Sequence, residues 1–134
     1  MNPKLPRNKC KNCGSECVAL SNIYCDSKCH KAHMYSEFIR KWKQGLITGN
    51  DESRVIVLSV HVRRYIWEKY DNKCNRCGWC EPHPRDGKPP LEIEHIDGNS
   101  SNSVESNLIL LCPNCHSLTD TYRGRNKGQG RANR

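Results

Sequence analysis

Ten cysteines in a chain of 134 residues constrain its fold more than any other feature. They lie in two groups of five, separated by 44 residues that contain no cysteine. Hydrophobic residues make up only 35 % of the chain, and this figure already includes the cysteines. So few apolar side chains bury too little area to stabilise domains of this size unaided. The cysteines are therefore expected to hold metal ions that stabilise the fold.

The classes of secreted and membrane proteins are not expected from this sequence. Residues 1–7 are polar and lack the apolar core of a secretory signal. No run of about 20 apolar residues is present, so no segment is expected to span a bilayer. A cytoplasmic location follows as an expectation, and cysteines in that compartment bind metal more often than they form disulfides.

The net charge favours a polyanionic partner. The chain has 22 Lys and Arg against 14 Asp and Glu, a formal charge of +8, and such a surplus is typical of nucleic-acid binding. Each Zn²⁺ held by four thiolates leaves a charge of about −2, so two such sites lower the total to about +4. The residues expected to contact DNA phosphates are Arg63, Arg64, Arg123, Arg125, Lys127 and Arg131.

The second cysteine group has the spacing of a closed zinc site. Cys74 and Cys77 are followed after 34 residues by Cys112 and Cys115. Two Cys-x2-Cys pairs complete a tetrahedral coordination shell with no open position, so this zinc is predicted to be structural. Cys80 is predicted to be a spare thiol, buried or half-exposed.

The first cysteine group predicts a compact N-terminal zinc finger. Its expected ligands are Cys10, Cys13, Cys25 and Cys29. Cys17, His30 and His33 remain alternative ligands.

Apolar spacing and capping residues predict the elements between the cysteines. Helices are expected over residues 34–42, closed by Gly45, and over 59–70, with Ser59 as N-cap. Residues 48–51 predict a loop, and 55–58 a strand or part of a helix. Strands are expected over residues 91–96 and 108–111, and another helix near Pro113. The predicted parts are a finger (1–33), a helical connector (34–70), a second zinc-stapled domain (71–122) and a basic tail (123–134).

The segment between the two C-terminal pairs resembles the HNH endonuclease family. Glu94-His95, then Asn107, then His116 occur in the family's order among the Cys-x2-Cys pairs. The resemblance covers residues 71–122, and features outside it look like phage-type members with an N-terminal zinc finger. It implies an α+β fold with a zinc-stapled ββα-metal finger, whose catalytic groups lie on a β-hairpin and the following helix.

The resemblance also implies a role for each residue. His95 is the expected general base that deprotonates water. Glu94 and His116 are expected to hold one catalytic divalent cation, Mg²⁺ or Mn²⁺, with Asp97 as a substitute ligand if Glu94 does not reach it. Asn107 is expected to brace the hairpin loop and keep His95 in position. The family more often has aspartate where this chain has Glu94.

The expected function is that of a metal-dependent DNA endonuclease. It would act on double-stranded DNA and leave 5′-phosphate and 3′-hydroxyl ends, with two structural Zn²⁺ ions and the catalytic cation. A homing, restriction or packaging role is equally compatible, inside a bacterial host cell if a phage encodes the chain. The alternatives are a non-catalytic zinc-binding DNA-recognition protein and a zinc adaptor for protein partners.

Overall fold

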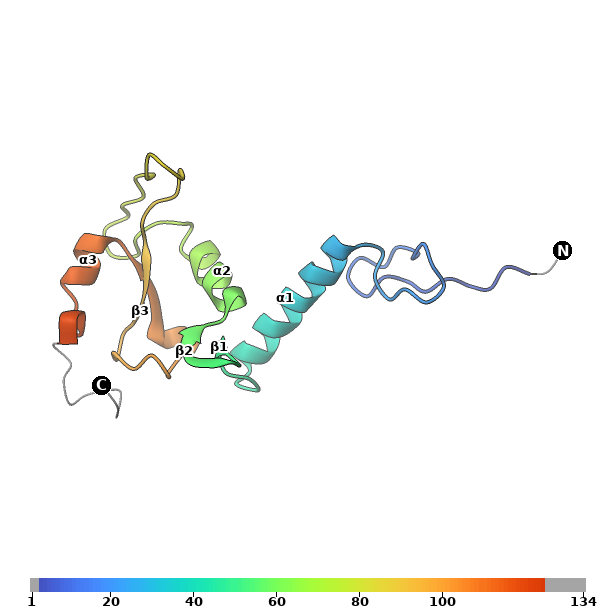
Figure 1. Cartoon of the computed structure of the whole chain (residues 1–134), viewed down its shortest axis with the longest axis horizontal. Helices are drawn as coiled ribbons and strands as arrows, with labels where there is room; N and C mark the ends of the chain where they lie inside the picture. The colour runs from blue at the N-terminus through green and yellow to red at the C-terminus, as the bar shows by residue number, and fades with distance from the viewer. Residues whose placement is uncertain (1–2, 125–134) are drawn as a thin grey trace. The chain divides into compact units, whose positions relative to one another are not determined.

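A computed structural model describes residues 3–124, which divide into two compact units (Figure 1). The first unit ends at Lys41 and the second begins at Trp42. In the described range, no helix is long and apolar enough to cross a membrane. Arg125, Lys127 and Arg131, predicted to contact DNA, lie outside the described residues. The division of the chain into a finger, a connector, a C-terminal domain and a tail stays a prediction.

Helix α1 (Ser27–Lys43) begins earlier than its apolar spacing predicts. Asp26 Oδ1 accepts a hydrogen bond of 2.7 Å from the backbone N–H of Cys29, which is an N-terminal capping contact. The predicted boundary between residues 33 and 34 therefore falls inside this helix. At the other end, Gly45 has a φ of +73° and its N–H donates to Trp42 O over 3.0 Å, as expected of a helix-ending glycine.

The second unit opens with a two-stranded antiparallel hairpin, β1 (Asn50–Asp51) and β2 (Arg54–Leu58). The loop predicted over residues 48–51 is wrong for its second half, because Asn50 pairs with Leu58 and Asp51 with Arg54. Asp51 Oδ1 accepts from Ser53 N over 2.8 Å and closes the turn. The ambiguous segment 55–58 is a strand.

Helix α2 (Val60–Lys69) confirms the predicted helix and its N-cap. Ser59 Oγ accepts from His61 N over 3.2 Å, and Tyr70 is the C-cap. Val62 and Ile66 are fully buried, one helical turn apart, and α2 packs against strand β4.

The predicted strands form a second hairpin, β3 (Glu92–His95) and β4 (Leu108–Leu111), in which His95 pairs with Leu108. A 3₁₀ turn, η1 (Glu105–Asn107), precedes β4. Helix α3 (Pro113–Ser117) follows it and packs against both strands. Figure 1 shows the hairpin between α2 and α3. Another 3₁₀ turn, η2 (Tyr122–Gly124), ends the described chain. This ββα order is that of the predicted α+β fold.

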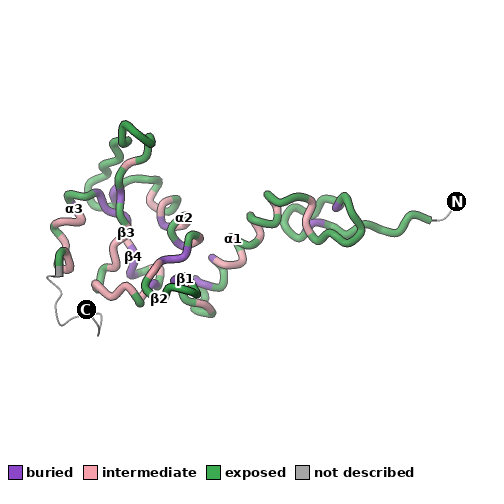
Figure 2. The backbone as a smooth tube through the Cα atoms, viewed as in Figure 1, coloured by how far each residue is buried: buried purple, intermediate pink, exposed green. Residues whose placement is uncertain are grey.

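The core of the second unit is small and includes cysteines. Its buried hydrophobic side chains are Trp42, Leu58, Val62, Ile66, Cys74, Leu91, Leu108, Leu110, Leu111, Cys112 and Cys115. Most of them lie on β4, on α2 and at the cysteine pairs; Trp42 is on α1, Leu58 on β2, and Leu91 precedes β3. In contrast, residues 81–88 form a fully exposed loop (Figure 2). The apolar core alone is therefore as limited as the composition predicts.

Candidate functional site

Two groups of four cysteines gather in the described part of the chain. They are Cys10, Cys13, Cys25 and Cys29, and Cys74, Cys77, Cys112 and Cys115, with the sulfurs of each group within 4.8 Å of one another. Cys13 Sγ lies 3.6 Å from Cys25 Sγ, and Cys77 Sγ lies 3.7 Å from Cys112 Sγ. Tetrahedral zinc with Zn–S bonds of about 2.3 Å places sulfurs about 3.8 Å apart, whereas a disulfide needs about 2.05 Å. The spacing fits Zn²⁺.

The first pair of each group forms the same backbone turn. Gly14 N donates to Cys10 O over 2.9 Å, and Gly78 N donates to Cys74 O over 2.8 Å. Both glycines have a positive φ, +77° and +78°. Such turns point backbone N–H groups toward the sulfurs and allow both cysteines of a pair to face one ion.

The pKa values of these thiols indicate a need for a cation. Burial opposes ionisation of Cys10, but the N–H groups of Cys13, Cys25 and Asn12 lower its pKa to about 6. Burial likewise opposes ionisation of Cys74, whose pKa backbone N–H groups also lower to about 6. In contrast, burial and the neighbouring sulfurs raise the pKa of Cys115 to about 12. Each group therefore contains at least one thiol that ionises readily, whereas ionisation of a thiol with a raised pKa, such as Cys115, requires a compensating charge.

The other sulfurs and rings near these groups lie outside them. Cys17 is fully buried but is not a member of the first group. His30 stacks on Tyr24 with a centroid distance of 4.7 Å, and the His33 ring lies 5.5 Å from the same tyrosine. Cys80 is exposed and not buried or half-buried as predicted, because the chain leaves the metal site there for the exposed loop 81–88.

Asn107 joins the two ends of the loop that connects β3 and β4. Its Oδ1 accepts from Asp97 N over 3.0 Å, and its Nδ2 donates to Asp97 Oδ1 and Asn102 O over 2.8 and 2.7 Å. Asp97 also accepts from Asn99 N and Asn102 Nδ2. Burial opposes the negative charge of the Asp97 carboxylate. Hydrogen bonds from Asn102, Asn99 and Asn107 outweigh that effect and lower the pKa of Asp97. Its carboxylate therefore holds the loop together.

Glu94 and His116 meet on one face of the β3–β4 hairpin. His116 Nδ1 lies 2.6 Å from Glu94 Oε2, and their side chains are 24 % and 11 % exposed. Glu94 Oε1 accepts from Thr121 Oγ1 over 2.5 Å. His116 Nε2 lies 3.1 Å from Glu92 Oε2, and the His116 ring packs edge-on against Tyr122.

The contact between Glu94 and His116 fits a shared cation. His116 Nδ1 is buried and has no hydrogen-bond partner among the described residues, although the Glu94 oxygen is so close. At this distance the two atoms repel unless positive charge lies between them, either a proton on Nδ1 or a bound cation. A divalent cation accepts one lone pair from each atom, and carboxylate with imidazole is a common ligand set for such ions.

His95 is directed to the other face of strand β3. Successive side chains of a strand alternate between faces, so Glu92 and Glu94 share the face of His116 and His95 does not. His95 Nε2 lies 3.2 Å from Ser103 Oγ, in the segment before η1. The structure thus brings Glu94 and His116 into direct contact, whereas His95 ends the strand on its opposite face, against Ser103.

Several side chains near these residues are absent from the sequence-based site. Glu92 contacts His116, and Thr121 contacts Glu94. A cavity of about 220 Å³ is lined by Glu94 together with Arg76 and Asp120. Glu92 could have been predicted, because it lies two residues before Glu94 and side chains two apart on a strand share a face. Arg76, Asp120 and Thr121 carry no comparable sequence signal, because Arg76 lies in the zinc turn and the other two follow α3.

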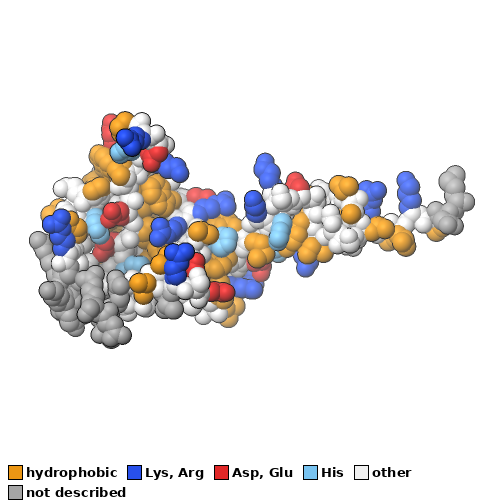
Figure 3. Space-filling view, in the orientation of Figure 1, with side chains coloured by type: hydrophobic (Ala, Val, Ile, Leu, Met, Phe, Trp, Pro, Cys, Tyr) orange, Lys and Arg blue, Asp and Glu red, His pale blue; other side chains and the backbone are white. Residues whose placement is uncertain are grey.

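The described basic residues predicted to contact DNA are exposed. Arg63 and Arg64 lie on α2, where Arg64 Nε pairs with Glu68 Oε1 at 2.8 Å. Arg123 lies over the Tyr122 ring at 5.3 Å. On the face shown in Figure 3, Lys and Arg side chains spread over several elements and do not form one patch. A DNA path is therefore not evident from charge alone.

Comparisons with known proteins find similarity to HNH endonucleases in the C-terminal part of the chain. Residues 74–120 match the model of the HNH endonuclease family. The H-N-H endonuclease F-TflIV of Escherichia phage T5 is 50 % identical over 62 residues, which cover 43 % of this chain and 25 % of the relative. The chain thus spans about a quarter of that relative's length. The structure of the type IV phosphorothioation-dependent restriction endonuclease ScoMcrA matches with a TM-score of 0.48 and 23 % identity, over 82 % of this chain and 25 % of that one.

Proposed function

We propose that this chain, whose residues 74–120 match the model of the HNH endonuclease family, is a metal-dependent endonuclease that hydrolyses phosphodiester bonds in DNA. The observation that carries the proposal is the contact between Glu94 and His116. His116 Nδ1 and Glu94 Oε2 lie 2.6 Å apart, and the buried nitrogen has no hydrogen bond of good geometry among the described residues. This carboxylate–imidazole pair offers a divalent cation one ligand atom from each residue.

Glu94 and His116 would hold the catalytic divalent cation, Mg²⁺ or Mn²⁺. Such an ion would polarise the phosphate and stabilise the negative charge on the leaving 3′-oxygen. Thr121 orients the Glu94 carboxylate by its hydrogen bond to Oε1. Arg76, in the cavity beside Glu94, supplies a positive charge for the phosphate.

His95 is the general base. It accepts a proton from water, the water oxygen bonds to phosphorus, and the bond from phosphorus to the 3′-oxygen breaks with its electron pair on that oxygen. The products are a 5′-phosphate and, after the leaving oxygen takes a proton from solvent, a 3′-hydroxyl. Asn107 maintains the loop after His95 and so keeps the imidazole in position.

The two cysteine groups would hold one structural Zn²⁺ each. The C-terminal group brings the segment before β3 to the start of α3, where Cys112 is the N-cap and His116 follows one turn later. The substrate is double-stranded DNA, and Arg63, Arg64, Arg123, Arg125, Lys127 and Arg131 contact its phosphates. Homing, restriction and packaging roles all fit this chemistry.

A plasmid-nicking assay tests the proposal. Supercoiled DNA is incubated with the full chain and Mg²⁺ or Mn²⁺, using the wild type, His95→Ala and His83→Ala. His95→Ala is expected to lower the nicking rate by about 10² to 10⁴-fold, because general-base catalysis contributes that much. His83 lies in the exposed loop 81–88, so His83→Ala is the matched control and retains activity.

DNA binding is measured on the same three proteins by a mobility-shift assay. His95→Ala is expected to bind DNA as the wild type does. Binding without nicking by the wild type, under either metal, would refute the endonuclease and leave a zinc-binding DNA-recognition protein. Equal nicking by His95→Ala and the wild type would refute the role of His95.

A further inference from the structure

The imidazole of His95 contacts a buried polar pair from two other segments. His95 Nε2 lies 3.2 Å from Ser103 Oγ, and the Ser103 hydroxyl donates to Asn50 Oδ1 in a short hydrogen bond. Asn50 and Ser103 are only 6 % and 5 % exposed. Asn50 begins strand β1 and lies outside the segment that matches the family. Buried polar groups are costly unless they are hydrogen-bonded, so the direction of each bond is strongly constrained.

The direction of these bonds follows from what each atom is able to donate. Asn50 Nδ2 donates to the backbone oxygen of Ser100 over 3.2 Å. A carbonyl oxygen only accepts, so the amide nitrogen must face Ser100 and the amide oxygen must face Ser103. The Ser103 hydroxyl has a single proton, which it gives to Asn50 Oδ1. Ser103 Oγ therefore accepts from His95, and His95 Nε2 carries a proton.

We propose that Asn50 and Ser103 are positioning residues that hold neutral His95 in its Nε2–H tautomer, so that Nδ1 is the nitrogen that accepts the proton from water. This inference rests on the proposed role of His95 as general base. When Nδ1 gains the proton, the bond from Nε2–H to Ser103 Oγ becomes charge-assisted and strengthens. The pair thus both orients the base and stabilises its protonated form.

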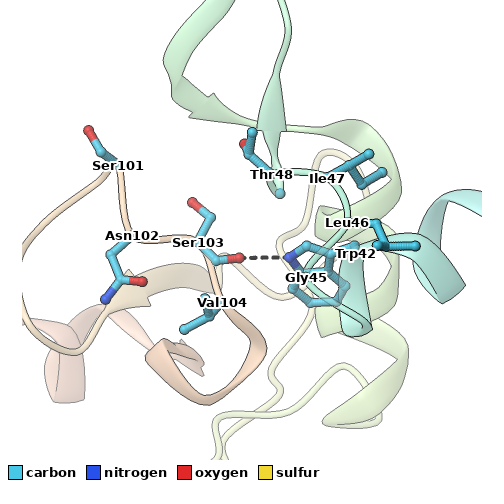
Figure 4. A pocket seen from close by; sticks show the side chains of 10 residues that line it. Trp42, Gly45, Leu46, Ile47, Thr48, Ser101, Asn102, Ser103 and Val104 are labelled. Carbon is cyan, nitrogen blue, oxygen red and sulfur yellow. Dashed lines mark hydrogen bonds between the residues drawn. The ribbon is translucent and has the colours of Figure 1, made fainter.

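The surroundings of Ser103 keep this pair in place. Trp42 Nε1 donates to Ser103 O over 2.7 Å, a buried bond that Figure 4 shows as a dashed line. Asn50 N donates to Thr48 Oγ1 over 2.9 Å. Both anchors line the same cavity of about 440 Å³, formed by residues 42–49 and 101–104. Ser103 is therefore bonded twice: its backbone oxygen accepts from Trp42, and its hydroxyl donates to Asn50. These two bonds hold Asn50 close to the β3–β4 hairpin.

The first test reads the tautomer directly and needs no activity. Full-length protein labelled with ¹⁵N-histidine is studied by long-range ¹H–¹⁵N NMR at a pH where His95 is neutral, with His95→Ala used to assign its signals. The wild type is expected to show a protonated-type Nε2 and an unprotonated-type Nδ1. Ser103→Ala is expected to move both signals toward a mixture of tautomers. A wild-type Nδ1–H tautomer, or unchanged signals in Ser103→Ala, would overturn the proposal.

The second test separates positioning from general stability. Ser103→Ala is expected to lower kcat for nicking by about 10- to 100-fold with little change in KM, a typical effect of losing a partner that orients a reacting group. Ser103→Thr, which keeps the hydroxyl, is expected to restore most of the rate. Ser101→Ala is the matched control, because Ser101 is exposed in the same loop. A normal kcat for Ser103→Ala would contradict the proposal.

The two tests distinguish failure of this inference from failure of the proposed function. If the wild type shows the Nε2–H tautomer, Ser103→Ala loses it, and the wild type never nicks DNA, the positioning role of the pair stands and the nuclease function is refuted. A wild type that nicks DNA with His95 in the Nδ1–H form would retain the nuclease and refute the pair. The wild-type spectrum decides the tautomer even if Ser103→Ala fails to fold.

Discussion

Glu105 shows how single charged residues stabilise the segment that carries the site. It lies in η1, between Ser103 and Asn107, and its carboxylate accepts from Tyr65 Oη over 2.7 Å. Lys69 Nζ lies 3.1 Å and Lys43 Nζ 3.9 Å from its two oxygens. Desolvation opposes the charge, but Tyr65 and the lysines lower the pKa of Glu105 overall. Its ionised form therefore stabilises the folded second unit.

Glu105→Gln is expected to lower the free energy of unfolding by about 1 kcal/mol near neutral pH, because the amide loses the charge-assisted bonds. Since the folded pKa is lowered, this stabilisation is present above the unfolded value of about 4.3 and disappears as the pH falls through the folded value. Denaturant unfolding at several pH values, with exposed Glu81→Gln as control, measures the difference. A difference of the same size at the lowest pH would contradict the role of the ionised carboxylate.

The start of the β1–β2 hairpin packs against Ser103, in the segment before η1. Gly49 precedes β1, and a Cβ atom there would lie 2.6 Å from Trp42 Nε1 and 2.7 Å from Ser103 O. Both are far inside normal contact distance, and the second is a backbone atom. Any side chain at residue 49 would therefore push β1 away from Ser103.

Gly49→Ala is expected to lower the free energy of unfolding by about 1 to 3 kcal/mol, the typical cost of overpacking. Nicking is expected to fall as well, because Asn50 and Ser103 separate. Thermal unfolding and the plasmid assay measure the two effects. Gly87→Ala is the control: Gly87 has a φ of +70° in open space, so the change adds only about 1 kcal/mol of backbone strain and leaves nicking intact. Equal behaviour of the two variants would exclude the steric explanation.

Across the whole molecule, each of the two compact units contains one complete cysteine group. In the second unit, the group lies where the limited apolar core meets β4 and the start of α3. A structural zinc site contributes folding free energy on the order of 10 kcal/mol, comparable to the total stability of a small domain. The two units should therefore depend on their own ions.

Metal analysis after dialysis is expected to give about two zinc ions per chain for the wild type and for Cys80→Ser, whose thiol lies outside both groups. Cys112→Ser and Cys25→Ser should each retain about one. NMR spectra are expected to show an unfolded second unit in Cys112→Ser, but a folded second unit in Cys25→Ser. A stable, fully active Cys112→Ser protein would refute the structural role of the C-terminal ion.

Local patterns were sufficient to predict several elements of the second unit. Ser59 and the apolar positions of 59–70 predicted α2, and the apolar run 108–111 predicted β4, because capping and burial periodicity act over a few residues. The early start of α1 was missed because Asp26 caps the helix outside its apolar stripe. The strand β1 was missed because two polar residues form a strand only through their partner.

The sequence by itself determined the cysteine spacing and the family resemblance, and it selected Glu94, His95, Asn107 and His116 as candidate site residues. Each of these depends on residue type and order along the chain. Only the tertiary structure decided which polar groups meet. Asn50 and Ser103 are 53 positions apart, and burial brings them together beside His95. No local spacing encodes such a contact, because it forms only when two separately specified hairpins pack and their polar groups must find partners.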